Sequence, residues 1–407
     1  MNFGFFTILA AQFFSSLADN ALLFAAIALL EDRAAPAWQT PVLQQFFVFS
    51  YIVLAPFVGP FADALPKGRV MFVSNAVKFS GCLAMLAGLN PLYAYGLVGI
   101  GAAMYSPAKY GILTEYLPPA KLVWANGWME GLTVASIILG AIVGGILIGP
   151  NAEAVASRLQ VTGIESAAEL ALVVIVAIYV VAAVFNLYIP RVALDHKLPK
   201  RTLGYILHDF WHCFRLLWRD PLGQVSLAVT TLFWGAGATL RLIVLTWAAV
   251  ALGFNREQAT QLTAVVAVGI ALGSVLAAKY VHLERSVKVL PVGVAMGLVV
   301  IAMTLTNDWR VAFVLLTVIG AMAGYFVVPM NALLQHRGHL LMGAGHSIAV
   351  QNFNENLSIL VMLGAYAMMI RADLSVYSII VVFGVFVALA MSYLWHKHGH
   401  DQDQGRI

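Results

Sequence analysis

The stretch that decides the fold is Leu170-Ala-Leu-Val-Val-Ile-Val-Ala-Ile-Tyr-Val-Val-Ala-Ala-Val-Phe-Asn-Leu-Tyr-Ile189, which carries no charged side chain. At about 1.5 Å of rise per residue, a helix of this length crosses the roughly 30 Å hydrocarbon core of a bilayer. Similar apolar runs lie at 4–30, 42–61, 70–89, 92–113, 123–149, 222–250, 258–278, 289–306, 311–335, 346–370 and 374–395. The sequence therefore predicts an all-α membrane protein with twelve transmembrane helices.

The longest polar connection runs from Pro190 to about Asp220 and divides the runs into six and six. Polar landmarks recur between the two groups, since Asp19 and Arg241 are 222 residues apart, as are Pro107 and Pro329. Transporters are often built from such repeats. We therefore predict two pseudo-symmetric six-helix halves. The predicted segments are an N-terminal half at 1–190, a cytoplasmic connection at 191–221, a C-terminal half at 222–396 and a cytoplasmic tail at 397–407.

The composition excludes other classes of protein. Of the 407 residues, 61% are hydrophobic and 10% are charged, against about 45–50% and 25% in soluble chains. A soluble enzyme, a disordered chain and a nucleic-acid-binding domain are thereby ruled out. Cys82 and Cys213 are too few for a disulfide framework. His208 and His212 have the i, i+4 spacing of metal ligands but no evident third ligand, so we predict neither a metal nor a cofactor.

Basic residues set the predicted orientation, because cytoplasmic loops are enriched in Lys and Arg. With both termini in the cytoplasm, fifteen of the 23 Lys and Arg residues lie in cytoplasmic segments, five in outer loops and three in spans. Within the central connection, residues 203–219 mix apolar and basic side chains. This pattern predicts a helix lying on the cytoplasmic membrane surface.

Some charged residues lie deep inside the predicted spans, where each costs about 2.5–3.5 kcal/mol on insertion scales. They are Asp19, Lys78, Lys109 and Arg241. We expect Asp19 and Arg241 at equivalent heights on opposite sides of a central cavity, as a substrate clamp, a latch or a purely structural ion pair. Lys109, close to Pro107, is a candidate phosphate or carboxylate partner or the counter-ion of Asp19, unless it extends to the interface. Lys78 either pairs with an acid or extends to the interface in the same way.

Two glutamates follow asparagines near the predicted cytoplasmic starts of spans: Glu130 follows Asn126, and Glu355 follows Asn352. They are candidates for gating hydrogen bonds or for binding a coupling ion. The alternative is helix-end electrostatics, because a glutamate is favoured near a helix N-terminus. An interfacial position is expected for Glu115. The candidate residues of a polar cavity or gate are Lys78, Tyr110, Glu115, Glu130, Asn352 and Glu355.

A loop motif follows the second run. The stretch Gly59-Pro-Phe-Ala-Asp63-Ala-Leu-Pro-Lys-Gly68-Arg69 resembles the loop between the second and third helices of the major facilitator superfamily, although Ala64 and two extra residues interrupt the usual spacing. Gly59, Asp63, Gly68 and Arg69 match the motif. The resemblance implies a conformational latch in which Asp63 and a neighbouring helix end stabilise the outward-open state.

Longer stretches resemble the bacterial lysophospholipid transporter (LplT) family of that superfamily. They are Asp19-Asn-Ala-Leu-Leu-Phe24, Tyr105-Ser-Pro-Ala-Lys-Tyr-Gly-Ile-Leu113, Phe233-Trp-Gly-Ala-Gly-Ala-Thr-Leu-Arg241, Asn331-Ala-Leu-Leu-Gln335 and Ile348-Ala-Val-Gln-Asn352. The resemblance implies a flippase, not an enzyme, in the bacterial inner membrane. The protein would move lysophosphatidylethanolamine and related lysolipids from the outer to the inner leaflet, and we expect it to act as a monomer. A cytoplasmic acyltransferase/acyl-ACP synthetase would then re-acylate them.

The resemblance also assigns roles to single residues. Asp19, Asn20, Lys109 and Arg241 become the substrate-binding or gating groups, in a mechanism of alternating access. The residues expected to contact the acyl tail are Phe13, Phe14, Phe24 and Trp234. The alternative function is a proton-coupled exporter of small amphiphilic compounds, with Asp19 as the protonation site.

Overall fold

The computed structural model describes residues 3–36, 38–159, 166–192 and 202–399. Over these residues the chain is built from helices, and no strand is present among them. The helices are α1 (Phe3–Asp32), α2 (Gln39–Ala64), α3 (Lys67–Leu86), α4 (Pro91–Tyr116), η1 (Pro119–Lys121), α5 (Leu122–Leu147), α6 (Pro150–Leu159), α7 (Ala167–Leu187), α8 (Leu203–Arg219), α9 (Pro221–Leu252), α10 (Arg256–Tyr280), η2 (Leu283–Val289), α11 (Leu290–Ala302), η3 (Met303–Leu305), α12 (Trp309–Met342), α13 (Ala344–Arg371) and α14 (Val376–His398).

Each of the twelve predicted spans falls on a helical segment. For the run at 289–306 this segment is α11, with η2 before it and η3 after it, and each of the other runs falls on a single α-helix. Eleven stretches in the described part of the chain are long and apolar enough to cross a membrane. The one predicted span that is not among these eleven stretches is α4, which has 26 residues and carries Lys109 and Glu115 besides its apolar side chains. It continues through Pro107, which has no backbone N–H and so removes one donor from the helical hydrogen bonds. The prediction of an all-α protein with twelve spanning helices is confirmed.

Helix ends follow local sequence rules. Ser166 and Glu169 form a reciprocal capping box at the start of α7, and Asp220 accepts a hydrogen bond from the Gly223 amide at the start of α9. Gly253 ends α9 in the left-handed conformation, with φ +65°, which glycine adopts without strain.

The chain divides into two compact units. The first comprises Met1–Tyr116, Ala135–Trp211 and Met342–Val350, and the second comprises Leu117–Val134, His212–Leu341 and Gln351–Ile407. Helices α5, α8 and α13 therefore each contribute residues to both units. The halves predicted at 1–190 and 222–396 stay a prediction. Much of the predicted connection (193–201) and most of the predicted tail (400–407) lie outside the described residues.

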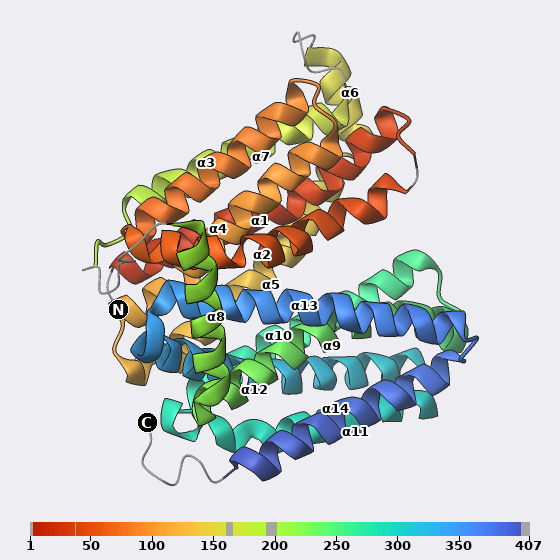
Figure 1. The fold of residues 1–407 in the computed structure, drawn as a ribbon. Helices are drawn as coiled ribbons and strands as arrows, with labels where there is room; N and C mark the ends of the chain where they lie inside the picture. The colour runs from red at the N-terminus through yellow and green to blue at the C-terminus, as the bar shows by residue number, and fades with distance from the viewer. Residues whose placement is uncertain (1–2, 37, 160–165, 193–201, 400–407) are drawn as a thin grey trace. The chain divides into compact units, whose positions relative to one another are not determined.

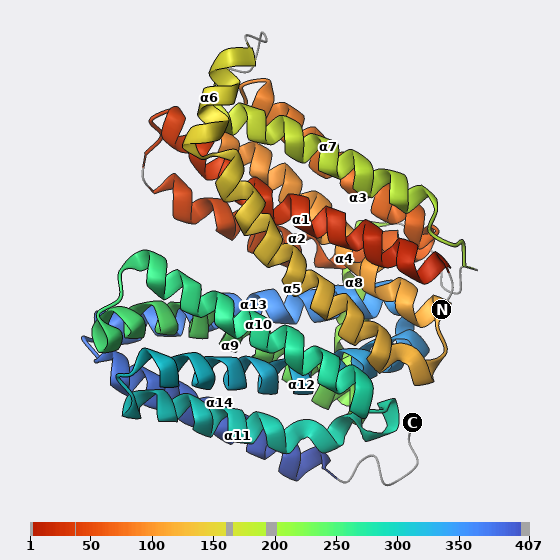
Figure 2. The ribbon, with the colours of Figure 1, turned by 180° about the vertical axis from the view of Figure 1, so that it is seen from behind.

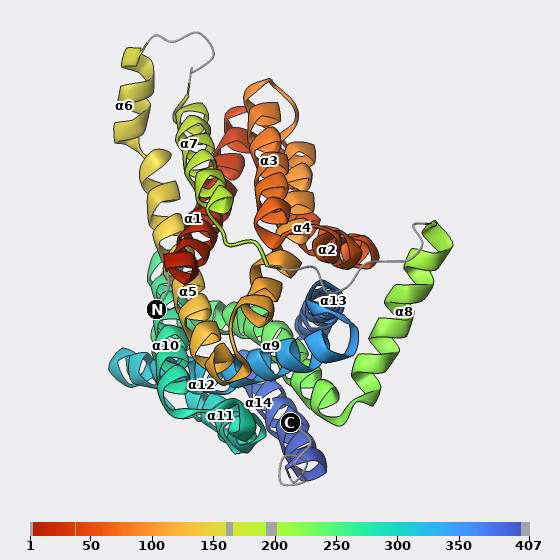
Figure 3. The same cartoon turned by 90° about the vertical axis from the view of Figure 1, so that its left-hand side faces the viewer.

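In the first unit, α1, α3, α4 and α7 lie side by side, and α2 packs on α4 (Figure 1). The fully buried side chains of Leu22, Val98, Leu172 and Tyr179 form part of its core. Small residues allow close approach: a Cβ on Gly101 would lie 2.7 Å from the Ser74 carbonyl oxygen. Figure 3 shows α6 at the end of this unit where α7 begins.

In the second unit, α9 packs against α10 and α14, and α11 packs along α14 (Figure 2). Glycines hold α10 against α12, since a Cβ on Gly269 would lie 3.0 Å from the Gly320 Cα. The predicted connecting helix is present as α8, with its apolar and polar residues on separate faces. Its position on a membrane surface stays a prediction.

Candidate functional site

An ion pair with a buried lysine lies in the first unit. Asp19 on α1 and Lys78 on α3 approach to 2.7 Å between Oδ2 and Nζ. The other carboxylate oxygen of Asp19 accepts a 2.6 Å hydrogen bond from the Tyr179 hydroxyl on α7. Three helices are thus joined around one carboxylate.

Neighbouring polar groups complete the surroundings of Lys78. Its Nζ donates to the Ser15 hydroxyl at 3.0 Å, and Ser15 in turn donates to the Asn75 side-chain oxygen at 2.8 Å. The ammonium also lies 4.6 Å from the centre of the Tyr105 ring. A lysine that is removed from water needs such partners.

The two members of the pair differ in exposure, and this difference matters for ligand access. The Lys78 side chain is 1% exposed, whereas that of Asp19 is 20% exposed. Lys78 therefore pairs with an acid, and the alternative that it extends to the interface is wrong. The accessible end of the pair is the carboxylate, which suits a cationic ligand group.

Arg241 lies in the second unit, about 30 Å along α9 from its start at Pro221. Its side chain is exposed, and it makes no hydrogen bond or ion pair with the described residues of its own unit. Asp19 has Lys78 as its counter-ion, and the pairing of Asp19 with Arg241 stays a prediction. The Asn20 amide donates to the Ser16 carbonyl within α1 at 2.8 Å.

Lys109 is half-buried on α4, and its ammonium lies 4.6 Å from the centre of the adjacent Tyr110 ring. Both residues belong to the first unit. The sequence makes Lys109 a candidate counter-ion of Asp19. In the structure, Lys78 is the counter-ion of Asp19. A role as phosphate or carboxylate partner of the cargo stays a prediction for Lys109.

The motif residue Asp63 contacts the N-terminus of α13. Its carboxylate accepts the backbone N–H groups of Gly345 at 2.8 Å and His346 at 3.1 Å. It also lies 2.7 Å from the Lys67 ammonium. An acid at a helix N-terminus is favoured by the unpaired N–H groups and by the helix dipole.

Lys67 joins Asp63 to a second acid. Its ammonium lies 3.0 Å from Glu115 at the end of α4 and donates to the Ala62 carbonyl at 2.7 Å. The Lys67 side chain is 2% exposed. Glu115 is therefore a buried ion-pair partner of the motif and not merely an interfacial charge.

His346 joins the motif to α8. Its Nδ1 lies 2.6 Å from Asp63, and its Nε2 lies 3.2 Å from Asp209 on α8. Both ring nitrogens donate at once in the protonated imidazole, so this form satisfies both carboxylates. We name Asp63, Lys67, Glu115, Asp209 and His346 the latch cluster.

Glycines bring the helices of the latch cluster together. A Cβ on Gly59 would lie 3.0 Å from the His346 Cα, and one on Gly68 would lie 2.9 Å from the Asn186 carbonyl oxygen. The connection before α13 turns at Gly343, where φ is +99°. Arg69 is exposed and lies outside the latch cluster.

A network of buried amides and acids lies in the second unit. Asn126 on α5 and Gln335 on α12 exchange two hydrogen bonds, of 2.9 and 2.8 Å. Gln351 on α13 donates to Asn331 at 2.9 Å and to Glu355 at 2.7 Å. Three helices are joined by these side chains.

Glu130 and Glu355 belong to this network rather than to helix ends. Glu130 accepts a 3.4 Å hydrogen bond from Asn331, and both glutamates are buried. Neither α5 nor α13 has an acid in its first turn, and the dipole effect is confined to that turn. The helix-end explanation is therefore wrong for both. Asn352 is also buried, and its carbonyl accepts a bond from Asn356.

The aromatic residues predicted to contact an acyl tail are distributed over both units. Phe13 and Phe14 are half-buried neighbours on α1, and Phe14 stacks on Phe185 of α7 with 5.7 Å between ring centres. Phe24 packs beside Gly144, and Trp234 of α9 lies against Phe233 at 5.5 Å. Their contact with a lipid tail stays a prediction.

Known proteins resemble this chain closely. The family model of the Major Facilitator Superfamily matches residues 8–362. The lysophospholipid transporter of Yersinia pestis (strain Pestoides F) is 46% identical over 365 residues, which cover 89% of this chain and 86% of that protein. The same figures hold for the transporter of Yersinia pseudotuberculosis serotype O:3 (strain YPIII).

The chain belongs to the lysophospholipid transporter family of the major facilitator superfamily. Solved structures support the same fold. The Escherichia coli fucose:proton symporter matches with a TM-score of 0.76 at 12% identity, over 96% of this chain and 98% of that one. A bacterial homologue of the iron transporter ferroportin, in its outward-facing state, matches with a TM-score of 0.71 at 16% identity, over 97% and 99%.

Several polar contacts of this protein were not predicted from its sequence. They involve Lys67, Asp209 and His346 in the latch cluster, Tyr179 at the ion pair, and Gln351 in the amide network. Only the spacing of Asp63 and Lys67, four residues apart, was visible in the sequence. Across the described residues, no group of three or more His, Cys, Asp or Glu side chains is arranged to hold a metal ion.

Proposed function

We propose that this protein is a lysophospholipid flippase that moves lysophosphatidylethanolamine and related lysolipids from the outer to the inner leaflet of the bacterial inner membrane. The proposal is supported by relatives named lysophospholipid transporters, which are 46% identical over most of their length. Its relatives transport lipids, and we infer transport without catalysis here as well.

The observation that carries the proposal is the exposed guanidinium of Arg241 in the interior of α9. An arginine at membrane depth is costly unless a partner compensates its charge. A phosphate is such a partner, because the planar guanidinium forms two parallel hydrogen bonds with phosphate oxygens. Arg241 therefore binds the phosphate of the cargo.

The ammonium of an ethanolamine head group requires an acid. Asp19 offers one, since it is the more exposed member of its ion pair. Its carboxylate then exchanges part of its interaction with Lys78 for one with the cargo. Asn20 and Lys109 act as further head-group contacts, and Phe13, Phe14, Phe24 and Trp234 contact the acyl chain.

Transport follows alternating access, with the latch cluster as a conformational lock. The acids and bases of this cluster are paired, and all except Asp209 are at most 9% exposed. Breaking the cluster therefore costs free energy in any state where α2 and α13 separate. The motif residues Gly59 and Gly68 permit the close helix contacts, and Asp63 makes the ionic ones. Glu130, Asn352 and Glu355 act as gate residues in the second unit.

The cellular setting follows from the charge distribution and the family. The excess of Lys and Arg in the predicted cytoplasmic loops supports a cytoplasmic position for both termini. Lysolipid delivered to the inner leaflet is the substrate of a cytoplasmic acyltransferase/acyl-ACP synthetase, which we infer to be the functional partner. The transporter acts as a monomer.

The test measures uptake of labelled lysophosphatidylethanolamine by spheroplasts that express the wild type, Arg241→Ala or Arg241→Lys at equal levels. We expect at least a tenfold loss of uptake for Arg241→Ala, equivalent to about 1.4 kcal/mol. Arg241→Lys keeps the charge without the bidentate geometry and should lose less. Unchanged uptake in Arg241→Ala would refute this role for the residue.

A second part of the experiment distinguishes the flippase from the alternative function, a proton-coupled exporter. An uncoupler collapses the proton gradient and abolishes export by a proton-coupled exporter of amphiphiles. Resistance to such compounds without any lysolipid uptake by the wild type would favour the exporter. Lysolipid uptake by the wild type supports the flippase.

A further inference from the structure

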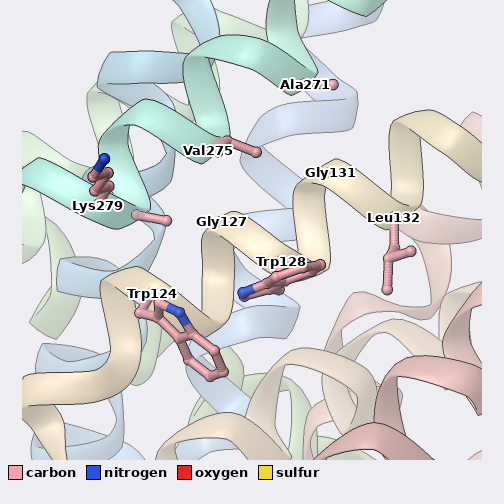
Figure 4. A pocket seen from close by; sticks show the side chains of 9 residues that line it. Trp124, Gly127, Trp128, Gly131, Leu132, Ala271, Val275 and Lys279 are labelled. Atoms are coloured by element: carbon pink, nitrogen blue, oxygen red, sulfur yellow. The ribbon is translucent and has the colours of Figure 1, made fainter.

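A groove opens on the surface of the second unit between the first half of α5 and the last half of α10. Its volume is about 470 Å³. Figure 4 shows Trp124, Trp128 and Leu132 along α5, and Val275 of α10 directed at the space between the two helices. All the lining residues lie within this one unit.

Small residues create the groove. A Cβ on Gly127 would lie 2.5 Å from the Ala278 Cβ and 2.9 Å from the Ser274 carbonyl oxygen, so the helices touch there. One turn further along α5, a Cβ on Gly131 would meet nothing within 4 Å. The helices thus separate from Gly127 towards Gly131, and no side chain fills the gap. Gly127 therefore allows the two helices to pack closely, whereas Gly131 does not contribute to this packing.

The two ends of the groove differ in chemistry. At one end lie Lys279, which is exposed, and the rings of Trp124 and Trp128, whose centres are 6.3 Å apart. Leu132 and Ala271 form the other end, which is apolar. Tryptophan and lysine together are typical of the membrane–water interface. The groove therefore has a cationic interfacial end and an apolar end that points into the membrane.

Its volume fits one acyl chain. A groove of about 470 Å³ has room for an acyl chain, because a methylene group is about as large as a water molecule. A lipid with a single chain and an anionic head group matches both the volume and the charge.

We propose that this groove is a second lysophospholipid site, where the acyl chain lies over Gly131 and the phosphate pairs with Lys279. The inference rests on the proposed function and adds a second binding site for the cargo. Lys279 lies in a predicted cytoplasmic segment, so the site holds cargo in the inner leaflet after it has crossed. None of its lining residues is among the polar groups described around Asp19.

The experiment uses the full chain in nanodiscs of two-chain phospholipid, with a lysophospholipid whose acyl chain carries bromine atoms. Bromine quenches tryptophan fluorescence at short range. The difference in quenching between the wild type and Trp128→Phe isolates the signal of Trp128. Gly131→Leu fills the groove, and Gly145→Leu is the matched control, because a Cβ on Gly145 of the same helix also meets nothing within 4 Å.

We expect saturable quenching of Trp128 in the wild type and in Gly145→Leu, and at least tenfold weaker apparent affinity in Gly131→Leu. Lys279→Gln should weaken binding as well, with Lys279→Arg restoring it. Equal quenching in Gly131→Leu and Gly145→Leu would overturn the site. Equal quenching by a brominated two-chain phospholipid would also overturn it, because the groove would then hold an ordinary membrane lipid.

Uptake by the same variants keeps this inference apart from the proposed function. If the wild type takes up no lysolipid, the proposed function fails. If the wild type takes it up and Gly131→Leu matches Gly145→Leu in both uptake and quenching, only the groove inference fails.

Discussion

At the residue scale, the pair of Asp19 and Lys78 shows how one buried charge determines the placement of others. Lys78 is nearly inaccessible, so its charge depends on Asp19, Ser15 and the ring of Tyr105. Asp19 is partly accessible and has a second partner in Tyr179. The two residues are therefore not equivalent, and removing either one has a different consequence.

This asymmetry predicts an order of stabilities. Asp19→Asn leaves an unpaired ammonium in the interior, which costs about 3 kcal/mol. Lys78→Met leaves the more accessible carboxylate and should cost less. The double variant removes both charges and should recover most of the loss. Thermal unfolding of the purified protein in detergent measures the order. Tyr179→Phe, which removes one hydrogen bond without any charge, serves as the control at about 1 kcal/mol. Losses that simply add in the double variant would refute the coupling.

At the element scale, the bounds of the helices followed from the sequence while their contacts did not. The run predicted at 170–189 is α7 at Ala167–Leu187, and the run at 222–250 is α9 at Pro221–Leu252. Hydrophobic runs, caps and prolines are local features, so a single sequence contains them. The predicted run at 289–306 is divided, with α11 ending at Ala302 and η3 following it.

The latch cluster shows why the contacts were harder to predict. Asp63 and His346 are 283 residues apart, and a single sequence has no local pattern that pairs them. The sequence predicts Lys67 as a loop charge because it lies between the apolar runs at 42–61 and 70–89. The burial of Glu130 and Glu355 was equally invisible, since it depends on amides from α12 and α13.

The contact between His346 and Asp209 predicts that α8 is held by the latch cluster. His346→Ala removes the partner of Asp209 and should increase hydrogen–deuterium exchange in Leu203–Arg219 severalfold. Asp209→Asn removes the charge from the α8 side alone and should give a smaller increase. Ser375→Ala, far from the cluster at the cap of α14, is the control and should leave exchange in α8 unchanged. Unaltered exchange in His346→Ala would mean that other contacts hold α8.

At the scale of the whole molecule, the twelve spans make a topological prediction that depends on no side-chain contact. Helix α6 lies between the fifth and sixth spans, whereas α8 follows the sixth. The two helices must therefore lie on opposite sides of the membrane. The distribution of Lys and Arg assigns α6 to the outside and α8 to the cytoplasm.

Cysteine labelling tests this arrangement because both native cysteines, Cys82 and Cys213, are buried and can be replaced by alanine. In that background, Ser157→Cys places an exposed thiol on α6 and Thr202→Cys places one just before α8. A membrane-impermeant maleimide should label Ser157→Cys in spheroplasts and Thr202→Cys in inverted vesicles. Labelling of both variants from one side would mean that α7, which lies between the two labelled positions, does not cross the membrane. The division into six and six spans would then be wrong. The reverse pattern would keep the six spans but invert the protein, and Lys279 would then face the outer leaflet. Its groove would receive cargo instead of releasing it, so the topology decides the direction in which the site acts.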